Sequence, residues 1–223
     1  MTEEKIFEGL KYLVSYPDGF TPDNNYPLVV FLHGAGTRSN DIEVLKRNTC
    51  FLNLQKRQSR QFILLAPLCN AHNWNELMQP VIKLVDEFRN SGFIDKNRVY
   101  ATGNSMGGYG SFELAAIRPE WFAAIMPICG GGIGGFAARL KNIPVRTFHG
   151  LCDNVVDPIE SIQMAKAINQ AGGYAELILF PKHDHNCWDT VYTTEENYDW
   201  LFSFVKNGDV SVKADTLTGE YYG

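Results

Sequence analysis

Residues 98–117 read RVYATGNSMGGYGSFELAAI, which joins a short strand pattern, a Gly-x-Ser-x-Gly turn and an Ala-rich helix pattern. The turn is centred on Ser105 and flanked by Gly103 and Gly107. So tight a turn leaves no room for a Cβ at either glycine, and Gly108 lets the helix pack closely. The pattern predicts a nucleophile elbow that holds the serine hydroxyl above a sheet at a helix N-terminus, where developing negative charge is favoured.

A serine hydroxyl becomes a good nucleophile when a histidine takes its proton and a carboxylate orients that histidine. Residues 144–150 (PVRTFHG) read as a buried strand, and Asp153 falls in the loop after it. Residues 175–180 (AELILF) read as another strand, and His185 falls in the next loop. The acid and the base therefore follow the elbow in the chain order that such a fold requires.

Both assignments have a rival. Asp157 is the second candidate acid, but it precedes a proline and an amphipathic run, residues 159–171, so we expect it to cap that helix. Asp153 is preferred because it lies nearer the strand end. His183 is the second candidate base, and either histidine of the His-Asp-His sequence could be a solvated loop residue; we expect the base to be His185.

The tetrahedral intermediate of acyl transfer needs backbone donors aimed at its negative oxygen. The amide of Met106, directly after the nucleophile, is one expected donor. Residues 26–36 (YPLVVFLHGAG) read as a buried strand that ends in a histidine and small residues. We expect the second donor there, from Ala35 or its neighbour Gly36. His33 is interpreted as a loop-anchoring side chain, because the chain order places the base last.

Four segments resemble the bacterial α/β-hydrolases related to phospholipase/carboxylesterase and dienelactone hydrolase proteins. That group includes predicted peptidases and polyhydroxybutyrate-depolymerase-like and feruloyl-esterase-like enzymes. The segments are YPLVVFLHGAG (26–36), RVYATGNSMGGYGSFELAAIRPEWFAAIMPICGGG (98–132), HGLCDNVV (149–156) and HNCW (185–188). The resemblance implies a nucleophile at Ser105, an acid at Asp153, a base at His185, and backbone donors at Ala35 and Met106.

The same resemblance implies a serine carboxylesterase. The lack of a long insertion between the core elements favours small or soluble esters, and acyl transfer by such a triad requires no cofactor. A peptidase with the same triad is the first alternative, and a noncatalytic binding protein on the same scaffold is the second. One departure is visible, because the group commonly has a proline directly after the His-Gly-x-x-Asp-x-Val-Val stretch, where this chain has Asp157 and then Pro158. No metal is expected, since the histidines lack metal-site spacing.

Length and composition fit one α/β-hydrolase domain over residues 1–223, because 223 residues with 45% hydrophobic side chains can build one core. A net charge of −5 without a basic run disfavours nucleic-acid and anionic-membrane partners. The N-terminus lacks a secretory signal pattern, so a cytoplasmic location is expected. The sequence predicts a small-molecule ester as the partner and says nothing of the oligomeric state.

The five cysteines form no Cys-x-x-Cys pair, and an odd number fits a reducing compartment. Cys152 adjoins the expected acid and Cys187 follows the expected base, so the two could lie close together. A disulfide or thiol switch is then conceivable, but ordinary packing is the preferred interpretation of both.

Strand patterns alternate with helix patterns, which predicts a mainly parallel central sheet flanked by helices, with the catalytic loops at its carboxyl edge and no large lid. The expected strands are 10–16, 28–32, 62–66, 99–102, 124–128, 145–148 and 177–180. The expected helices are 42–58, 80–91, 108–117, 159–171 and 195–206. The glycine run 130–135 reads as a flexible loop beside the site, and the polar segment 209–223 as a loosely docked tail.

Three aromatic residues are candidates for the walls of the substrate cleft. Trp74 follows an expected strand end, Trp188 lies three residues past the expected base, and Phe136 follows the glycine run. Aromatic walls suit an apolar or aromatic acyl group. Trp188 could instead pack only the histidine loop, and the sequence does not separate these readings.

Overall fold

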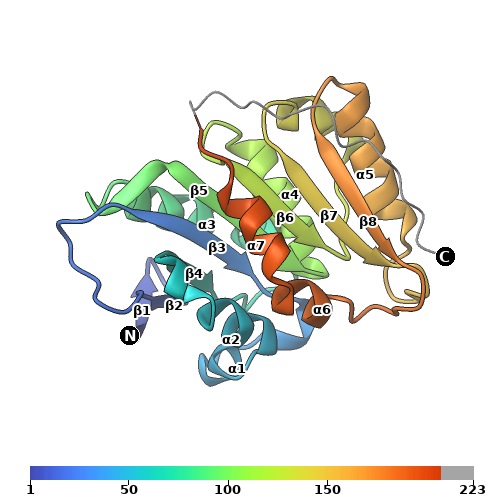
Figure 1. The fold of residues 1–223 in the computed structure, drawn as a ribbon. Helices are drawn as coiled ribbons and strands as arrows, with labels where there is room; N and C mark the ends of the chain where they lie inside the picture. The colour runs from blue at the N-terminus through green and yellow to red at the C-terminus, as the bar shows by residue number, and fades with distance from the viewer. Residues whose placement is uncertain (207–223) are drawn as a thin grey trace.

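A computed structural model describes residues 1–206, which form an eight-stranded sheet covered by helices on both faces (Figure 1). The strands are β1 (Thr2–Phe7), β2 (Leu10–Ser15), β3 (Tyr26–Leu32), β4 (Ile63–Pro67), β5 (Ile94–Asn104), β6 (Ala124–Ile128), β7 (Val145–Gly150) and β8 (Ala175–Phe180). Their order across the sheet is β1-β2-β4-β3-β5-β6-β7-β8. β2 runs antiparallel to both of its neighbours, and the strands from β4 to β8 are parallel. The expected mainly parallel sheet is confirmed.

Helices follow most of the strands. They are α1 (Glu43–Lys46), α2 (Thr49–Gln55), α3 (Trp74–Arg89), α4 (Met106–Ile117), α5 (Ile159–Gln170), α6 (Trp188–Thr193) and α7 (Glu195–Phe202). Three 3-10 turns, η1 (Ala35–Thr37), η2 (Gln58–Arg60) and η3 (Gly134–Leu140), lie in the connections. None of the helices in residues 1–206 is both long enough and apolar enough to cross a bilayer.

The core lies on both faces of the sheet because successive side chains of a strand point to opposite sides. On β3, Leu28 and Val30 belong to the cluster that packs against α3, α4 and α5. Val29 and Phe31 belong to the cluster that packs against α2, α6 and α7. All four side chains are fully buried. This explains why the central strands read as continuous apolar runs rather than alternating ones.

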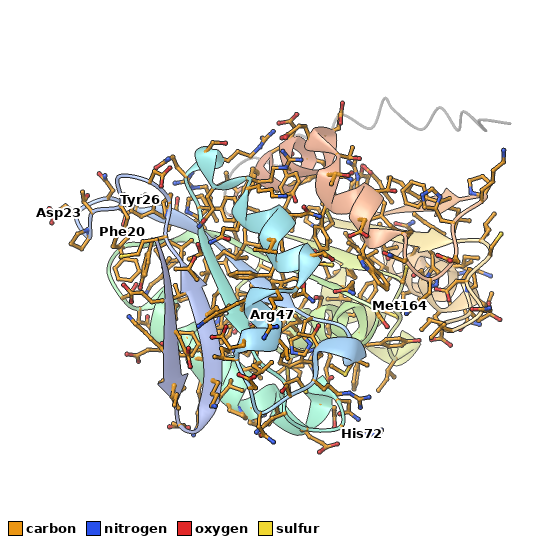
Figure 2. The ribbon with its side chains drawn as sticks, turned by 90° about the horizontal axis from the view of Figure 1, so that it is seen from below. Phe20, Asp23, Tyr26, Arg47, His72 and Met164 are labelled. Atoms are coloured by element: carbon orange, nitrogen blue, oxygen red, sulfur yellow. The ribbon has the colours of Figure 1, made fainter. Side chains whose placement is uncertain are left out.

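Aromatic side chains pack together near the start of β3. Phe20 lies beside Tyr26 (Figure 2), and their ring centroids are 5.3 Å apart. Phe93, just before β5, packs edge-on against Phe20 at 5.4 Å. The polar turn between β2 and β3 is therefore fixed to the core by Phe20.

Several expected element boundaries were wrong, each for a local reason. β1 was missed because its side chains are largely exposed at the sheet edge and show no buried face. The expected helix 42–58 is two helices, since Asn48 interrupts it and caps α2 by accepting a hydrogen bond from Phe51 N at 2.9 Å. α3 begins at Trp74 and carries Pro80 inside it, whereas the proline was read as the start.

Two further differences lie near the C-terminus of the described region. The segment after the histidine loop forms α6, which the sequence reading left without structure. α7 ends at Phe202 instead of continuing to 206. The expected tail at 209–223 lies outside the described residues.

The parallel strands bring the candidate groups to one edge of the sheet. Ala35 follows β3, Ser105 follows β5, Asp153 follows β7 and His185 follows β8. These are the carboxyl ends of parallel strands, where open α/β sheets place their sites.

Candidate active site

Close backbone contacts hold the turn at Ser105. A Cβ on Gly107 would overlap the carbonyl oxygen of Leu32 on β3, and one on Gly103 would overlap the carbonyl oxygens of both Leu32 and Gly107. Ser105 itself has φ 56° and ψ −119°, a backbone conformation that residues other than glycine rarely adopt. Its amide donates to the carbonyl of Ile128 on β6 at 2.8 Å. The expected elbow geometry is therefore present, and its glycines stand where the expected close approaches occur.

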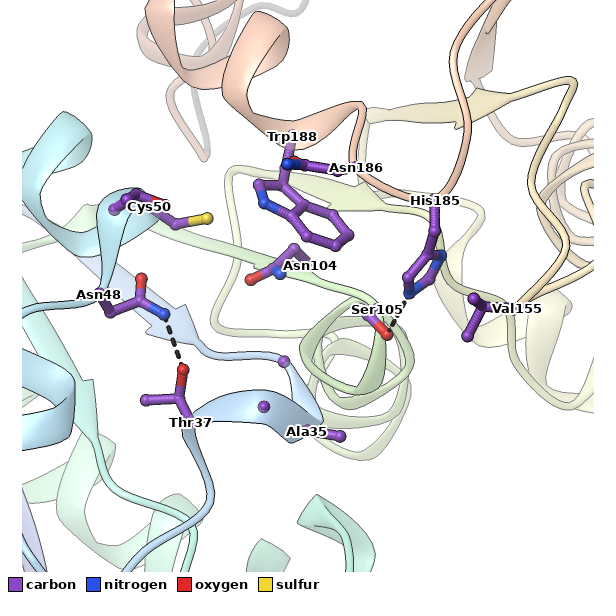
Figure 3. A pocket seen from close by; sticks show the side chains of 13 residues that line it. Ala35, Thr37, Asn48, Cys50, Asn104, Ser105, Val155, His185, Asn186 and Trp188 are labelled. Carbon is purple, nitrogen blue, oxygen red and sulfur yellow. Dashed lines mark hydrogen bonds between the residues drawn. The ribbon is translucent and has the colours of Figure 1, made fainter.

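A continuous hydrogen-bond chain runs from Ser105 to Asp153. Ser105 Oγ is hydrogen-bonded to His185 Nε2 (Figure 3), and the two atoms lie 2.8 Å apart. His185 Nδ1 lies 2.6 Å from Asp153 Oδ2. Because a carboxylate only accepts, the Nδ1 hydrogen points to Asp153 and Nε2 is left to accept the Ser105 proton. This arrangement can deprotonate the hydroxyl when it attacks a carbonyl carbon.

The Asp153 carboxyl is buried and fully hydrogen-bonded. Its Oδ1 accepts from the amides of Val155 at 2.8 Å and Val156 at 2.9 Å. Burial raises the pKa of the Asp153 carboxyl, but the hydrogen bonds from His185 and the two amides outweigh burial, so the net pKa lies below the ordinary value. Asp153 is therefore ionised at neutral pH and can stabilise a protonated His185.

Neither rival residue joins this chain. Asp157 Oδ1 accepts from the Ile159 amide at 2.9 Å at the start of α5, which is the capping contact expected of it. His183 Nε2 lies 3.1 Å from Thr190 Oγ1, and its ring packs on Phe180. Among the residues described, the Ser105 hydroxyl and the Asp153 carboxylate are joined through His185.

The loop that carries Ala35 is anchored by His33, as expected. His33 Nε2 accepts from the amide of Cys69 at 2.9 Å, and Nδ1 lies 2.8 Å from the Gly34 carbonyl. Burial lowers the pKa of His33 to about 4, so the ring is neutral and donates through Nδ1. Arg38 Nε donates to the Ala35 carbonyl at 3.0 Å, which fixes the next turn of the loop.

Trp74, expected at the cleft wall, instead lines a separate hollow beside Met106 and Tyr109. Its side chain is almost fully buried at the start of α3, and its Nε1 donates to the His33 carbonyl at 2.9 Å. The indole also packs edge-on against the His33 ring, with centroids 4.9 Å apart. Trp74 supports the Ala35 loop from behind and does not line the pocket that contains Ser105.

A pocket of about 490 Å³ opens beside Ser105 (Figure 3). Its wall includes Trp188, whose ring meets His185 edge-on at 5.1 Å. Trp188 therefore both borders the pocket and packs the histidine loop. The remaining lining is Gly34, Ala35, Gly36, Thr37, Asn48, Thr49, Cys50, Asn104, Val155, His185 and Asn186.

Phe136 does not reach this pocket, which corrects the expectation for it. It is 41% exposed on η3 and lines a different, mainly apolar hollow of about 350 Å³ with Phe112, Ile133 and Met164. Met106, one of the two expected backbone donors, is the first residue of α4 and lies in the chain directly after Ser105. Ala35 lies in η1 on the pocket wall.

The sequence left open whether Cys152 and Cys187 lie close together, and the structure places Cys187 beside Cys129 instead. Cys187 Sγ lies 3.0 Å from Cys129 Sγ, not against Cys152, and both residues of this pair are buried. Cys152 is exposed, and its Sγ lies 3.4 Å from the Pro181 carbonyl oxygen. Cys129, Asp153 and His185 have potential ligand atoms within 4.8 Å of one another, but the His185 and Asp153 atoms already take part in the chain to Ser105.

Sequence reasoning missed the second histidine beside Asp153. His149, fully buried near the end of β7, places Nε2 3.1 Å from Asp153 Oδ2. The only signal for it was its position in a buried strand pattern four residues before the acid. Asn48 and Asn104 in the pocket wall were missed as well, because nothing in their local sequence marks them.

Comparison with known proteins gives three similarities. The model of the prolyl oligopeptidase family matches residues 69–131, which include the elbow and make up less than a third of the chain. A protein named "Probable feruloyl esterase C" from Aspergillus terreus is 28% identical over 172 residues, covering 74% of this chain and 63% of its own length. A thermostable esterase structure superimposes with a TM-score of 0.79 at 29% identity, covering 92% of this chain and 63% of the other.

More distant structures share the fold alone. Dipeptidyl peptidase 4 of Porphyromonas gingivalis superimposes with a TM-score of 0.70 at 14% identity, covering 91% of this chain and 35% of the peptidase. This chain spans slightly less than two thirds of the esterases described above. The sheet order, the elbow at Ser105 and these similarities together show an α/β-hydrolase fold, and the chain is similar in sequence to serine esterases.

Proposed function

We propose that the chain is a serine carboxylesterase that hydrolyses small esters through an acyl-enzyme on Ser105. The observation that carries the proposal is the unbroken chain Ser105 Oγ, His185, Asp153, with heavy-atom distances of 2.8 and 2.6 Å. The hydroxyl attacks the ester carbonyl carbon while His185 Nε2 takes its proton. The histidine then protonates the leaving alcohol, and water repeats the sequence to release the acid.

The negative oxygen of each tetrahedral intermediate is assigned to the amides of Ala35 and Met106. Both amides are held in place by their surroundings. His33 and Arg38 hold the loop that carries Ala35, and the elbow fixes the start of α4, where Met106 lies. Preorganised amides of this kind stabilise the intermediate because they need no rearrangement as charge develops.

Pocket size and lining favour small esters with an aromatic or short acyl group. A volume of about 490 Å³ is at the lower end of ligand-sized cavities. The Trp188 ring offers a flat apolar wall beside His185, and the asparagines around it offer hydrogen bonds to hydroxyl or ether oxygens. The similarity to a protein named as a feruloyl esterase makes hydroxycinnamate esters the first natural-type substrates to test.

Peptide hydrolysis is the second candidate, because the matching family model is that of the prolyl oligopeptidases. The same three side chains would serve, but His185 would have to protonate an amine leaving group. Amide cleavage and ester cleavage can therefore be compared on one protein with the same nucleophile.

The test measures hydrolysis of p-nitrophenyl acetate, butyrate and octanoate, methyl ferulate, and a p-nitroanilide peptide by wild type and Ser105→Ala. We expect the wild type to hydrolyse the short esters and methyl ferulate, with octanoate slower, and the variant to be inactive on all. Faster turnover of the anilide than of the esters would favour the peptidase. Ester hydrolysis that persists unchanged in the variant would overturn the assignment of Ser105.

A further inference from the structure

A second histidine, His149, is buried beside the candidate acid and has no assigned role in the chain to Ser105. Its side chain is fully enclosed, and its two ring nitrogens have three polar neighbours. Nδ1 lies 2.7 Å from Ser161 Oγ on α5. Nε2 lies 3.1 Å from Asp153 Oδ2 and 3.0 Å from the Val156 carbonyl oxygen. Which nitrogens carry hydrogens follows from what these neighbours can accept or donate.

The hydrogen on Nδ1 is fixed by Ser161. Ser161 Oγ lies 2.6 Å from the Gly130 carbonyl oxygen, and a carbonyl cannot donate, so the single hydroxyl hydrogen of Ser161 occupies that contact. Ser161 Oγ then has only lone pairs left to offer to His149. Nδ1 must therefore donate to it.

The hydrogen on Nε2 is fixed from the other side. The Val156 carbonyl accepts only, and the Asp153 carboxylate is ionised because its hydrogen bonds lower its pKa below the ordinary value. Within residues 1–206, Nε2 faces two acceptors and no donor, so it carries a hydrogen as well. With hydrogens on both nitrogens the ring is an imidazolium, and Asp153 supplies the opposite charge that a buried cation requires.

We propose that His149 is a charged positioning residue for the active site, which shares Asp153 with His185. This inference rests on the proposed function. Asp153 Oδ2 then receives one hydrogen bond from each histidine, and the Val155 and Val156 amides bind Oδ1, so the carboxylate has a single orientation. The geometry makes the resting site a pair of one cation and one anion, with His185 neutral and ready to accept the Ser105 proton.

The second cation also affects the reaction step. When His185 takes the proton from Ser105, Asp153 lies between two positive rings, and the like charge on His149 disfavours that state. The charge on His149 therefore reduces the extent to which Asp153 stabilises the protonated form of His185. Return of that proton to the leaving alcohol becomes easier.

Other titratable groups near this cluster have partners of their own. Directly after β6 and on the histidine loop, the thiols of Cys129 and Cys187 face each other at 3.0 Å. On α4 and α5, the Tyr109 hydroxyl is hydrogen-bonded to Glu160. The pH response of the Asp153 site is therefore assigned to His149 and His185.

The test compares wild type with His149→Asn, which removes the charge but keeps a side-chain donor. For p-nitrophenyl acetate we expect kcat to fall about tenfold with KM little changed, because His149 does not line the pocket. The acid limb of the kcat/KM profile should move to higher pH by about one unit, since the cation beside Asp153 is lost. His183→Asn, on the same loop as His185 but bonded to Thr190, is the matched control and should leave the limb in place.

A direct measurement decides the charge without turnover. Long-range ¹H–¹⁵N spectra of the wild type at pH 7 should show a hydrogen on both nitrogens of His149. The His149 signals are assigned by their loss in His149→Asn or, if that variant does not fold, in His149→Gln. A neutral ring in these spectra, or an acid limb that stays fixed or moves to lower pH in a folded variant, would overturn the proposal. Inactivity of the wild type on all esters would reject the proposed function and leave the spectra to decide the charge.

Discussion

Two regions of the same sheet edge are held in place by different forces. At the elbow after β5, Ser105 is fixed by backbone contacts, with no space for a Cβ on Gly107 or Gly103. At the ends of β7 and β8, Asp153 and His185 are fixed by side-chain hydrogen bonds. The elbow depends on glycines, which have no Cβ atom, whereas the acid and base loops depend on hydrogen bonds between particular polar atoms and on their protonation.

The second region also contains a close backbone contact at one glycine. Gly150 ends β7, and a Cβ there would overlap the carbonyl oxygens of His183 and Asp184. This contact lets the acid strand approach the histidine loop as closely as the Asp153 to His185 hydrogen bond requires. The comparison predicts that changes at the elbow mainly affect folding, while polar changes at the acid and base loops mainly affect the reaction.

The largest effect is expected from Asp153→Asn. Asparagine can still accept from the Val155 and Val156 amides, so the loop should keep its shape. It cannot accept the Nδ1 hydrogen through a charged oxygen, and kcat should fall by up to about 10⁴-fold. Steady-state kinetics on p-nitrophenyl acetate measure this, with Asp157→Asn as the control of the same chemical change. Near-normal turnover in Asp153→Asn, or a comparable loss in Asp157→Asn, would reverse the assignment of the acid.

Next in size is Gly107→Ala at the elbow. The new methyl group would meet the Leu32 carbonyl, a backbone atom that cannot move aside cheaply, and the free energy of unfolding should drop by about 3 kcal/mol. Gly134→Ala is a matched control, because a Cβ there meets no atom within 4 Å. Urea unfolding at pH 7 checks both variants. Equal stability of the two would show that the elbow is not held by close packing.

A smaller effect is expected from pH acting on His33. Its folded pKa is about 4, below the ordinary value of 6.5, so the unfolded chain binds more protons between these values. Stability is therefore complete above pH 6.5 and decreases as pH falls toward 4. The contribution of His33 should cost about 2 kcal/mol between pH 7 and pH 5. Urea unfolding at both values, with His33→Gln for comparison, measures it; an identical pH slope in the two proteins would contradict this role.

The smallest effect is expected from Asp157→Ala in the second region. The change removes the acceptor for the Ile159 amide at the start of α5 and should cost about 1 kcal/mol of unfolding free energy. Ester hydrolysis should be unaffected, because Asp157 has no contact with His185 in the described structure. Thermal unfolding and kinetics on one sample test both statements together. Loss of activity at full stability would make Asp157 part of the site.

The comparison also explains what the sequence could predict. The elbow was predicted in detail, because a motif of glycines around Ser105 encodes a local backbone shape. The sheet was predicted because its central strands are apolar runs separated by helix patterns. Asp153 and His185 were predicted from their places after two such strands, so chain order supplied what local sequence could not.

The residues that were missed or misplaced depend on contacts distant in the sequence. His149 shows its role only when Ser161 and Gly130 are brought to it by α5 and β6. Trp74 was expected in the cleft, but its burial against His33 is decided by how the start of α3 packs on the loop after β3. The sequence suggested Cys152 as a neighbour of Cys187, but its neighbour in the structure is Cys129, directly after β6. The pattern of apolar residues predicts which face of each helix or strand is buried. It does not predict which polar atoms of different elements come into contact.

The central claim is that Ser105 is the nucleophile, and covalent labelling tests it most directly. A fluorophosphonate reacts with a serine hydroxyl only where a base activates it, so it reports the chain to His185 without assuming a substrate. Intact-mass analysis should show one adduct on the wild type, located by peptide mapping to the fragment that contains Ser105, and no adduct on Ser105→Ala. Labelling of another residue, or equal labelling of the folded Ser105→Ala variant, would contradict the account.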